Sequence, residues 1–388
     1  MQHLNGEGYS VALADGTLVI SHVPYVQSVG SVAYGKLLVP LAMEGGGVAP
    51  PRVHQAWWTG TAPKETDGAP LAGVSVLRGP QSCVAGFPRP MMLCGRIRGR
   101  EFHDHLEFVS TYVALLGAPA AALDPNATAR VGTGSTAQAV DTGPFAYIDT
   151  ASSRTALGAV NATIRGQTIG IVGLGGTGSY VLDLVSKCAV DAIHLYDDDE
   201  FEQHSAFRAP GAATIDDLRA RRRKVDHFAQ VYRGLNRRIV PHAVRIDART
   251  APLLDVLDFA FVCIDDAAAK PPILNRLAGR GIAYVDVGMG LQDSERGIVG
   301  AVRTTLVAPG DEEMAKRVPL VGDPDGVYAT NIQICELNAL NAAFAVIAWK
   351  RHRGFYASFR PQANGVFVVE DGRLHVEERN GCSDMDEA

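Results

Sequence analysis

The sequence predicts an α/β protein in which a mostly parallel sheet follows a strand-rich α+β unit and is followed by a β-hairpin. The first observation behind this prediction is the stretch 168–199. A hydrophobic run at 168–172 leads into the glycine-rich loop 173–178, a helical stretch and a second apolar strand at 192–196 that ends in three aspartates. Strand, glycine turn, helix and strand in this order are typical of a nucleotide-binding βαβ unit.

The second observation is the alternation that follows. Apolar strands are expected at 239–244, 259–264 and 283–287, and a helical stretch lies at 267–281. Strands that alternate with helices indicate a mostly parallel sheet with helices on both faces, so the fold class is α/β and Rossmann-like. One charged helix is expected at 215–236 and one long helix at 331–353, where polar residues argue for a buried soluble helix rather than a membrane span.

The third observation is a hairpin signal near each end of the sequence. Strands at 10–13 and 17–20 flank Asp15 and Gly16, and strands at 365–370 and 373–376 flank Asp371 and Gly372, which are hairpin signals. Further strands and a helix at 101–116, ended by Gly117 and Pro119, complete the first unit. We expect three parts: an accessory domain at 1–130, a linker rich in small residues at 131–150, and the nucleotide-binding domain at 151–388.

Composition narrows the function. A formal net charge of −6 gives no support to a nucleic-acid partner or to an anionic membrane surface. The six cysteines form no Cys-x-x-Cys pair, and no signal peptide is evident, so free thiols in the cytoplasm are expected. Histidines in the first unit, among them His103 and His105, leave a metal site there as an open alternative, although two residues apart on a helix places them on different faces.

The glycine loop is the first candidate site. Glycines let the backbone approach a pyrophosphate and direct the N–H groups of the following helix at it. The candidates are Gly173, Gly175, Gly176 and Gly178, and the extra Gly176 is expected to widen the space around a triphosphate.

Charged residues after the loop suggest what binds there. Asp197, at the end of the second strand, can accept hydrogen bonds from both ribose hydroxyls, and Asp199 is an alternative or a residue near a metal. Arg208 and Lys224 offer two cations for a triphosphate, and Asp265 follows a later strand and offers a carboxylate to Mg²⁺. Each residue also has a simpler explanation: a surface pair, a basic helix face or a helix cap.

Residues 150–350 resemble the ThiF/MoeB/ubiquitin-activating superfamily of adenylating enzymes. The segment 171–178 is similar to its nucleotide loop, 197–208 to its Asp-x-Asp motif that ends in arginine, and 263–266 to its Cys-x-Asp-Asn strand end. The sequence departs from that pattern at three positions, where Ser205 replaces asparagine, Ala209 replaces glutamine and Asp266 replaces asparagine.

The resemblance implies ATP and Mg²⁺ as cofactors and a homodimer. Asp197 would bind ribose, Arg208 and Lys224 would hold phosphates with Ser205 beside them, and Asp265 would bind Mg²⁺. Arg154 would reach the phosphates of a neighbouring subunit. Residues 22–25, 206–212 and 331–349 extend the resemblance to bacterial ThiF-like proteins that are encoded beside ubiquitin-like and ubiquitin-conjugating-like proteins. The expected partners are therefore a ubiquitin-like protein with a C-terminal glycine and a ubiquitin-conjugating-like protein.

The acceptor after adenylation is less defined. Conjugating members of the superfamily carry a cysteine in the crossover segment, but 309–331 contains none. Cys188, Cys263 and Cys335 are expected to be buried. The adenylate would pass directly to a partner, or a hydroxyl such as Thr330 or Ser294 would accept the acyl group as an ester.

Other functions stay open. A nicotinamide-dependent oxidoreductase would use the same loop and Asp197 but leaves Arg208, Lys224 and Asp265 unexplained. A catalytically degenerate scaffold could bind a ubiquitin-like protein without turnover. Adenylation of a peptide or a tRNA base is a third alternative.

Overall fold

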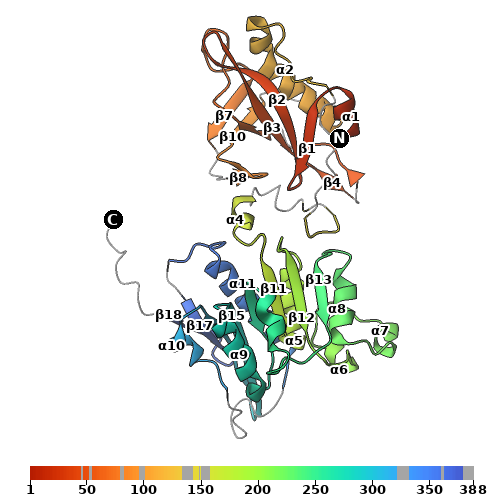
Figure 1. Ribbon diagram of the computed structural model, residues 1–388, viewed down its shortest axis with the longest axis vertical. Helices are drawn as coiled ribbons and strands as arrows, with labels where there is room; N and C mark the ends of the chain where they lie inside the picture. The colour runs from red at the N-terminus through yellow and green to blue at the C-terminus, as the bar shows by residue number, and fades with distance from the viewer. Residues whose placement is uncertain are drawn as a thin grey trace. The chain divides into compact units, whose positions relative to one another are not determined.

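A computed structural model describes most of the chain as two compact units. The first unit comprises Met1–Gly143 and Tyr147–Ala162, and the second comprises Pro144–Ala146 and Thr163–Ala388 (Figure 1). The described residues are 1–44, 47–51, 55–78, 83–95, 101–132, 143–147, 149, 158–320, 332–359 and 362–378.

The first unit is built on an antiparallel sheet with the strand order β1-β2-β3-β6-β10-β7. Ala14 pairs with Thr17, which confirms the hairpin at Asp15 and Gly16, and both turn residues have positive φ. The six strands are β1 (Ser10–Ala14), β2 (Thr17–Ser28), β3 (Ser31–Pro40), β6 (Gln55–Thr59), β7 (Val74–Arg78) and β10 (Met91–Gly95). Smaller elements are α1 (Gln2–Gly6), α4 (Gly158–Ala162), β4 (Met43–Glu44), β5 (Gly47–Val48), β8 (Cys83–Val84) and β9 (Phe87–Pro88).

Helix α2 (His105–Leu123) covers this sheet and is longer than the sequence predicts. It begins after Asp104, whose side chain caps it, and it continues through Gly117 and Pro119, where the sequence predicts its end. Pro119 lacks an N–H and weakens the last turn, but Leu116 and Ala120 are buried on either side of it, so packing maintains the helix. By length and composition α2 could cross a bilayer; in this unit its buried side chains form the core.

The second unit contains an eight-stranded sheet in the order β13-β12-β11-β14-β15-β16-β17-β18. The strands are β11 (Thr168–Val172), β12 (Ala192–Tyr196), β13 (Ile239–His242), β14 (Phe259–Val262), β15 (Ala283–Ser294), β16 (Gly297–Val307), β17 (Gln362–Val368) and β18 (Arg373–Glu378). The first five strands of the order are parallel, and the last three pair antiparallel. This confirms the predicted α/β class, and the C-terminal hairpin extends the main sheet.

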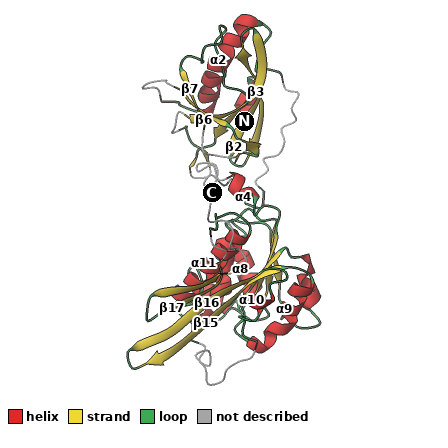
Figure 2. Cartoon of the chain, turned by 90° about the vertical axis from the view of Figure 1, so that its left-hand side faces the viewer, coloured by secondary structure: helices red, strands yellow, loops and turns green. Residues whose placement is uncertain are grey.

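Helices cover both faces of this sheet, as predicted (Figure 2). Buried residues of α5 (Gly176–Val185), α8 (Lys224–Tyr232) and α11 (Cys335–His352) share one core cluster with the sheet. Buried residues of α9 (Lys270–Gly279) and of the 3-10 helix η1 (Ala251–Val256) belong to another. The remaining elements are α6 (Gln203–Ala206), α7 (Ile215–Arg219), α10 (Glu312–Ala315) and the short η2 (Ala267–Ala269).

The prediction of a single helix at 215–236 is wrong, because two separate helices, α7 and α8, lie there and are joined by a non-helical segment. Arg221 has a φ of 44°, which an α-helix does not accommodate. The N–H of Phe201 donates to the carbonyl of Arg222 at 2.8 Å, and Glu200 forms a β-bridge with Arg223. These tertiary hydrogen bonds replace helical ones, and as a result Lys224 is the first residue of α8.

Candidate nucleotide site

The glycine loop connects β11 to α5 and packs against the end of β14. Gly173 has a φ of 89°, and a Cβ added there would lie 2.8 Å from the carbonyl oxygen of Cys263. A Cβ on Gly178 would lie 1.9 Å from the carbonyl oxygen of Gly173. Gly175 is the N-cap of α5, and a Cβ there would meet no atom within 4 Å. Two glycines are therefore required by packing, while the space beside Gly175 is open.

Gly176 has a different role from the one expected. A Cβ on Gly176 would lie 2.1 Å from Nδ2 of Asn338, so the missing side chain makes room for Asn338 rather than for phosphate. Asn338, on α11, also accepts a hydrogen bond from Oγ1 of Thr177 at 2.9 Å. Its Nδ2 is buried and has no hydrogen-bond partner among the described residues. Because Asn338 lies 161 residues from Thr177, sequence spacing gave no sign of this contact.

Asp197 lies where β12 ends, beside the loop. Its Oδ2 accepts from the N–H of Leu174 at 2.7 Å, and its Oδ1 accepts from the N–H of Asp199 at 2.9 Å. Burial raises the pKa of this carboxyl, and Lys224 and the two backbone donors oppose the rise. The backbone donors fix the orientation of the carboxylate at the carboxyl edge of the sheet, where ligands bind in open α/β folds.

Lys224 stands next to this carboxylate. Its Nζ is 2.6 Å from Oδ2 of Asp199 and 3.8 Å from Oδ1 of Asp197, and its side chain is only 6% exposed. The hydrogen bond from Lys224 lowers the pKa of Asp199. The break before α8 produces this geometry, since the N–H of Lys224 donates to the carbonyl of Asp199. Three of the predicted residues thus come together.

Ser205 lies on α6, and Arg208 lies just after that helix. Oγ of Ser205 and Nε of Arg208 are buried and have no hydrogen-bond partner among the described residues. A buried donor without an acceptor costs free energy, more so when it is charged. These two atoms are therefore suited to a ligand that brings acceptors, as a polyphosphate does. Ala209 is buried in the core, where the superfamily pattern has glutamine.

Asp265 and Asp266 lie beyond the end of β14 and are exposed. Asp266 accepts from the N–H of Ala268 at 3.0 Å and pairs with Arg245 at 2.8 Å, so its carboxylate is already engaged. Asp265 is the exposed carboxylate that the superfamily pattern assigns to Mg²⁺. Mg²⁺ commonly takes one or two carboxylates and completes its shell with phosphates and water. Among the described residues no group of three or more His, Cys, Asp or Glu is arranged to hold a metal.

Of the two candidate acceptors, Thr330 lies outside the described residues, as does Arg154, the residue expected to reach the phosphates of a neighbouring subunit. Ser294 is described, and it donates to the carbonyl of Gly297 at the tip of the β15–β16 hairpin. At about 3.3 Å per residue, that tip is roughly 26 Å along β15 from Asp286, which pairs with Val262 at the end of β14.

The cysteines differ from one another. Cys188 is buried as expected, whereas Cys263 and Cys335 are only partly buried. Burial raises the pKa of the Cys263 thiol. Sγ of Cys335 lies 2.8 Å from the hydroxyl of Tyr180.

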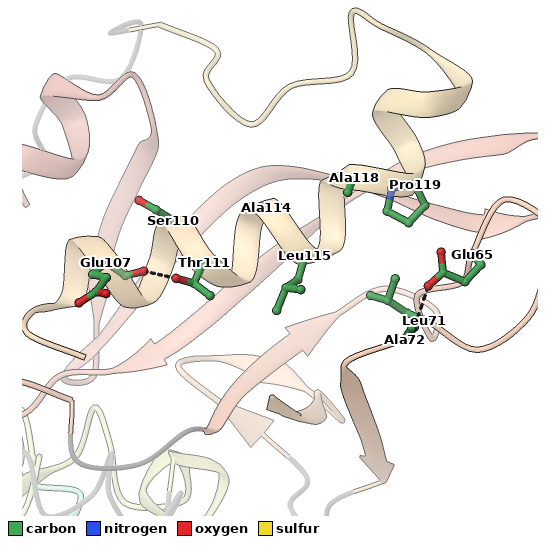
Figure 3. A pocket seen from close by; sticks show the side chains of 10 residues that line it. All are labelled: Glu65, Leu71, Ala72, Glu107, Ser110, Thr111, Ala114, Leu115, Ala118 and Pro119. Atoms are coloured by element: carbon green, nitrogen blue, oxygen red, sulfur yellow. Dashed lines mark hydrogen bonds between the residues drawn. The ribbon is translucent and has the colours of Figure 1, made fainter. Parts of the chain in front are cut away.

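The first unit has a groove of its own between α2 and the loop that carries Glu65 and Leu71. It has a volume of about 660 Å³ (Figure 3). Small and apolar side chains such as Ala114, Leu115 and Ala118 line it. Its two carboxylates, Glu65 and Glu107, both accept backbone hydrogen bonds, so the groove shows no converging set of reactive groups.

Fold and site together define a Rossmann-like α/β protein with a nucleotide loop, an acidic strand end and a buried lysine. A family model for the ThiF family matches residues 155–349, slightly more than half of the chain, and the chain belongs to this family. Residues 1–150 match a domain of unknown function, DUF6791. No curated protein sequence matches the chain.

Solved structures with a similar fold include PaaA, at 16% identity and a TM-score of 0.44, covering 56% of this chain and 66% of PaaA. E. coli MccB with ATP has 16% identity and a TM-score of 0.43, with coverage of 56% and 65%. E. coli tRNA N6-threonylcarbamoyladenosine dehydratase, TcdA, in complex with AMP has 17% identity and a TM-score of 0.39, with coverage of 53% and 93%. The chain spans just under two thirds of the length of PaaA and of MccB.

Proposed function

We propose that this chain is an ATP- and Mg²⁺-dependent adenylyltransferase that activates the C-terminal carboxylate of a ubiquitin-like protein in a bacterial ubiquitination-like pathway. The observation that carries the proposal is the buried Nε of Arg208, a charged donor with no acceptor among the described residues. A phosphate of ATP would supply the acceptor. Membership of the ThiF family agrees with this assignment.

The other residues of the site fit the same ligand. The open space beside Gly175 lies at the N-terminus of α5, where the first N–H groups can receive a phosphate. Asp197 would accept the ribose hydroxyls, with its carboxylate already oriented by Leu174 and Asp199. Lys224 would supply a second positive charge at the phosphates.

The reaction needs no protein base. An oxygen of the substrate carboxylate, ionised at neutral pH, attacks the α-phosphorus of ATP. The bond between the α-phosphorus and the bridging oxygen breaks, pyrophosphate leaves with the electron pair, and an acyl-adenylate remains. Arg208 and Lys224 would stabilise the charge that develops on the phosphates and hold the reactants in line. Mg²⁺, held by Asp265, would neutralise part of the triphosphate charge.

The proposal does not include a thioester on this chain. Cys188 is buried in the core and Cys335 contacts Tyr180. The adenylate would pass to a ubiquitin-conjugating-like partner, or the hydroxyl of Thr330 would take the acyl group as an ester and release AMP. An adduct that resists thiols and is cleaved by hydroxylamine would support the ester. The proposal also includes a homodimer in which Arg154 completes the neighbouring site, which sedimentation of wild type and Arg154→Ala with ATP would test.

The decisive experiment measures exchange of radiolabelled pyrophosphate into ATP. Wild type with a ubiquitin-like protein that ends in glycine should exchange label. Arg208→Gln and Asp265→Ala should lower the rate by at least about 100-fold, the usual cost of an electrostatic stabiliser. Arg219→Gln is the matched control, because Arg219 is exposed and pairs with Asp216 on its own helix. Unchanged exchange in both site variants would exclude the assignment.

A non-catalytic scaffold is the second candidate, and three residues favour it. Ser205 and Ala209 lack the amides of the superfamily pattern, and Asp266 is tied to Arg245. A scaffold would bind ATP or a ubiquitin-like protein without pyrophosphate exchange. A nicotinamide enzyme would instead be stabilised against heat by NAD and not by ATP–Mg²⁺.

A further inference from the structure

Two asparagines lie about one turn apart on α11, and both are buried in the second unit. Asn338 is 1% exposed and Asn341 is 0% exposed. Asparagine is seldom buried unless its amide forms hydrogen bonds. The hydrogen bonds of the two side chains can therefore be compared atom by atom.

Asn341 has partners inside the protein for both ends of its amide. Its Oδ1 accepts from Oγ1 of Thr304 at 2.9 Å, and its Nδ2 donates to the carbonyl of Gly288 at 3.0 Å. Gly288 belongs to β15 and Thr304 to β16. Asn341 is thus a structural residue that joins α11 to the sheet.

Asn338 has a partner at only one end of its amide. Its Oδ1 accepts from Oγ1 of Thr177 at 2.9 Å, while its buried Nδ2 has no hydrogen-bond partner among the described residues. A side-chain amide carries two N–H donors, and a buried donor without an acceptor costs free energy. Ser205 and Arg208 in the nucleotide site have buried donors in the same state. Asn338 therefore differs from Asn341 in having donors left for a ligand.

The unpaired donor of Asn338 lies against the first turn of α5. A Cβ on Gly176, the first residue of α5, would lie 2.1 Å from Nδ2, so this nitrogen occupies the side-chain position of Gly176. Side chains on an α-helix tilt toward its N-terminus, which places Nδ2 beside the N-terminal end of α5. At the neighbouring Gly175 a Cβ would meet no atom within 4 Å. The donor therefore borders the space in which the proposed phosphates would lie.

The chemistry of this position favours a phosphate oxygen as the acceptor. The first N–H groups of an α-helix lack helical acceptors and carry the positive end of the helix dipole, so they attract an anion. A phosphate has enough oxygen atoms to accept from these N–H groups and from Nδ2 at the same time, and hydrogen bonds to an ionised acceptor are the stronger ones.

We propose that Asn338 is a phosphate-binding residue of the nucleotide site, and that its Nδ2 donates to the phosphate chain of ATP at the N-terminus of α5. The hydrogen bond between Thr177 and Oδ1 fixes the orientation of the amide. The inference rests on the proposed adenylation, because it adds a residue of α11 to the ATP site of that reaction.

The test measures binding of ATP–Mg²⁺ to the full-length protein by calorimetry. Asn338→Ala removes the donor and should weaken binding about tenfold or more, as expected for one hydrogen bond to a charged group. Asn338→Asp keeps an acceptor for Thr177 but replaces the donor with a carboxylate oxygen. This variant should weaken binding more than Asn338→Ala does, because its charge repels the phosphates.

Asn341→Ala is the matched control, since it truncates the same type of side chain on the same helix. It removes two hydrogen bonds within the protein and should lower the melting temperature, but the affinity for ATP–Mg²⁺ should change less than twofold. Thermal melts establish that each variant is folded at the temperature of the titration. If Asn338→Asp does not fold, the comparison of the two alanine variants decides.

The outcomes are distinct. Wild-type affinity in folded Asn338→Ala, or an equal loss in Asn341→Ala, would overturn the inference. Loss in Asn338→Ala with wild-type affinity in Asn338→Asp would also overturn it, because Asn338 would then act only through Thr177. If wild type still exchanges pyrophosphate in these cases, the proposed adenylation survives.

The opposite result separates the two proposals in the other direction. If binding of ATP–Mg²⁺ depends on Asn338 as expected but wild type does not exchange pyrophosphate, the phosphate contact stands and the adenylation proposal fails. If wild type does not bind ATP–Mg²⁺ at all, both fail.

Discussion

The side-chain amide of Asn338 fills the place that any side chain on Gly176 would need. A Cβ added to Gly176 would lie 2.1 Å from Nδ2 and 2.4 Å from Cγ of Asn338. The two residues belong to α11 and α5, so the shape of the glycine loop depends on a helix near the end of the sheet domain.

Gly176→Ala should destabilise the second unit, because the added methyl group collides with Asn338. Overpacking of this kind costs about 1–3 kcal/mol. Asn338→Ala alone should cost about 1 kcal/mol through the lost hydrogen bond with Thr177. The double variant should be more stable than the sum of the two effects predicts, because truncation of the Asn338 side chain leaves room for the methyl group. Urea unfolding of the four proteins measures the coupling, and strict additivity would contradict the contact.

Lys224→Met should abolish the stabilisation by ATP–Mg²⁺. At about 100 times its dissociation constant, a ligand stabilises a protein by about 2.7 kcal/mol. Without Lys224, two carboxylates face the phosphates with no cation between them, so the thermal shift should vanish. Lys187→Met is the control, since Lys187 also pairs with an aspartate at 2.6 Å but is 54% exposed. A normal ATP shift in Lys224→Met would remove this residue from the site.

The stability of the second unit should depend on the protonation of Asp197. Burial raises the pKa of this carboxyl in the folded state, so over a range above the ordinary value of about 4 the folded state binds more protons than the unfolded state. Stability therefore falls as the pH rises through this range. Asp197→Asn removes this titration, so the free energy of unfolding of the variant should increase relative to that of wild type as the pH rises. Parallel pH profiles in urea unfolding would be inconsistent with a raised pKa.

The break before α8 should be sensitive to the residue at 221. Arg221→Gly relieves the strain of a left-handed conformation, so the free energy of unfolding should increase by about 0.5–1 kcal/mol. Loss of the surface ion pair with Glu200 would reduce this gain. Arg221→Pro cannot adopt a φ of 44°, and it should displace Lys224 and weaken ATP binding at least tenfold. Nucleotide titrations of both variants measure the effect. Equal ATP affinity in both would mean that the break does not position Lys224.

The sequence predicted the βαβ unit, the alternation that follows it and both hairpins, because local periodicity and turn residues determine these elements. It also placed Asp197 and Lys224 as candidates, and the structure brings them within 3.8 Å. The helix break at Arg221 was missed, since the segment contains good helix formers and only hydrogen bonds with residues 200 and 201 disrupt it. The prediction that the first long helix ends at Gly117 was wrong, because burial of side chains in the next turn outweighs the loss of a hydrogen bond at Pro119.

The buried ion pairs that Asp286 forms with Lys270 and Arg303 were also missed, although one sign of them was available. Arg303 is a charged residue in β16, whose other residues are uncharged, and such a residue needs a partner when the strand is buried. Its partner could not be identified from the sequence, because Lys270 and Asp286 come from a helix and a strand that only the sheet order brings together. Arg154 and Thr330 lie outside the described residues, so their proposed roles stay predictions.

The contact between Thr177 and Asn338 also affects how the protein is made. Residues 161 positions apart must meet before the glycine loop is packed, and Trp349 must likewise reach Gln167, 182 positions away. Contacts this distant in sequence slow folding. On the ribosome the first unit can be complete while the second still lacks α11. The nucleotide loop would therefore complete its packing only after α11 has left the ribosome.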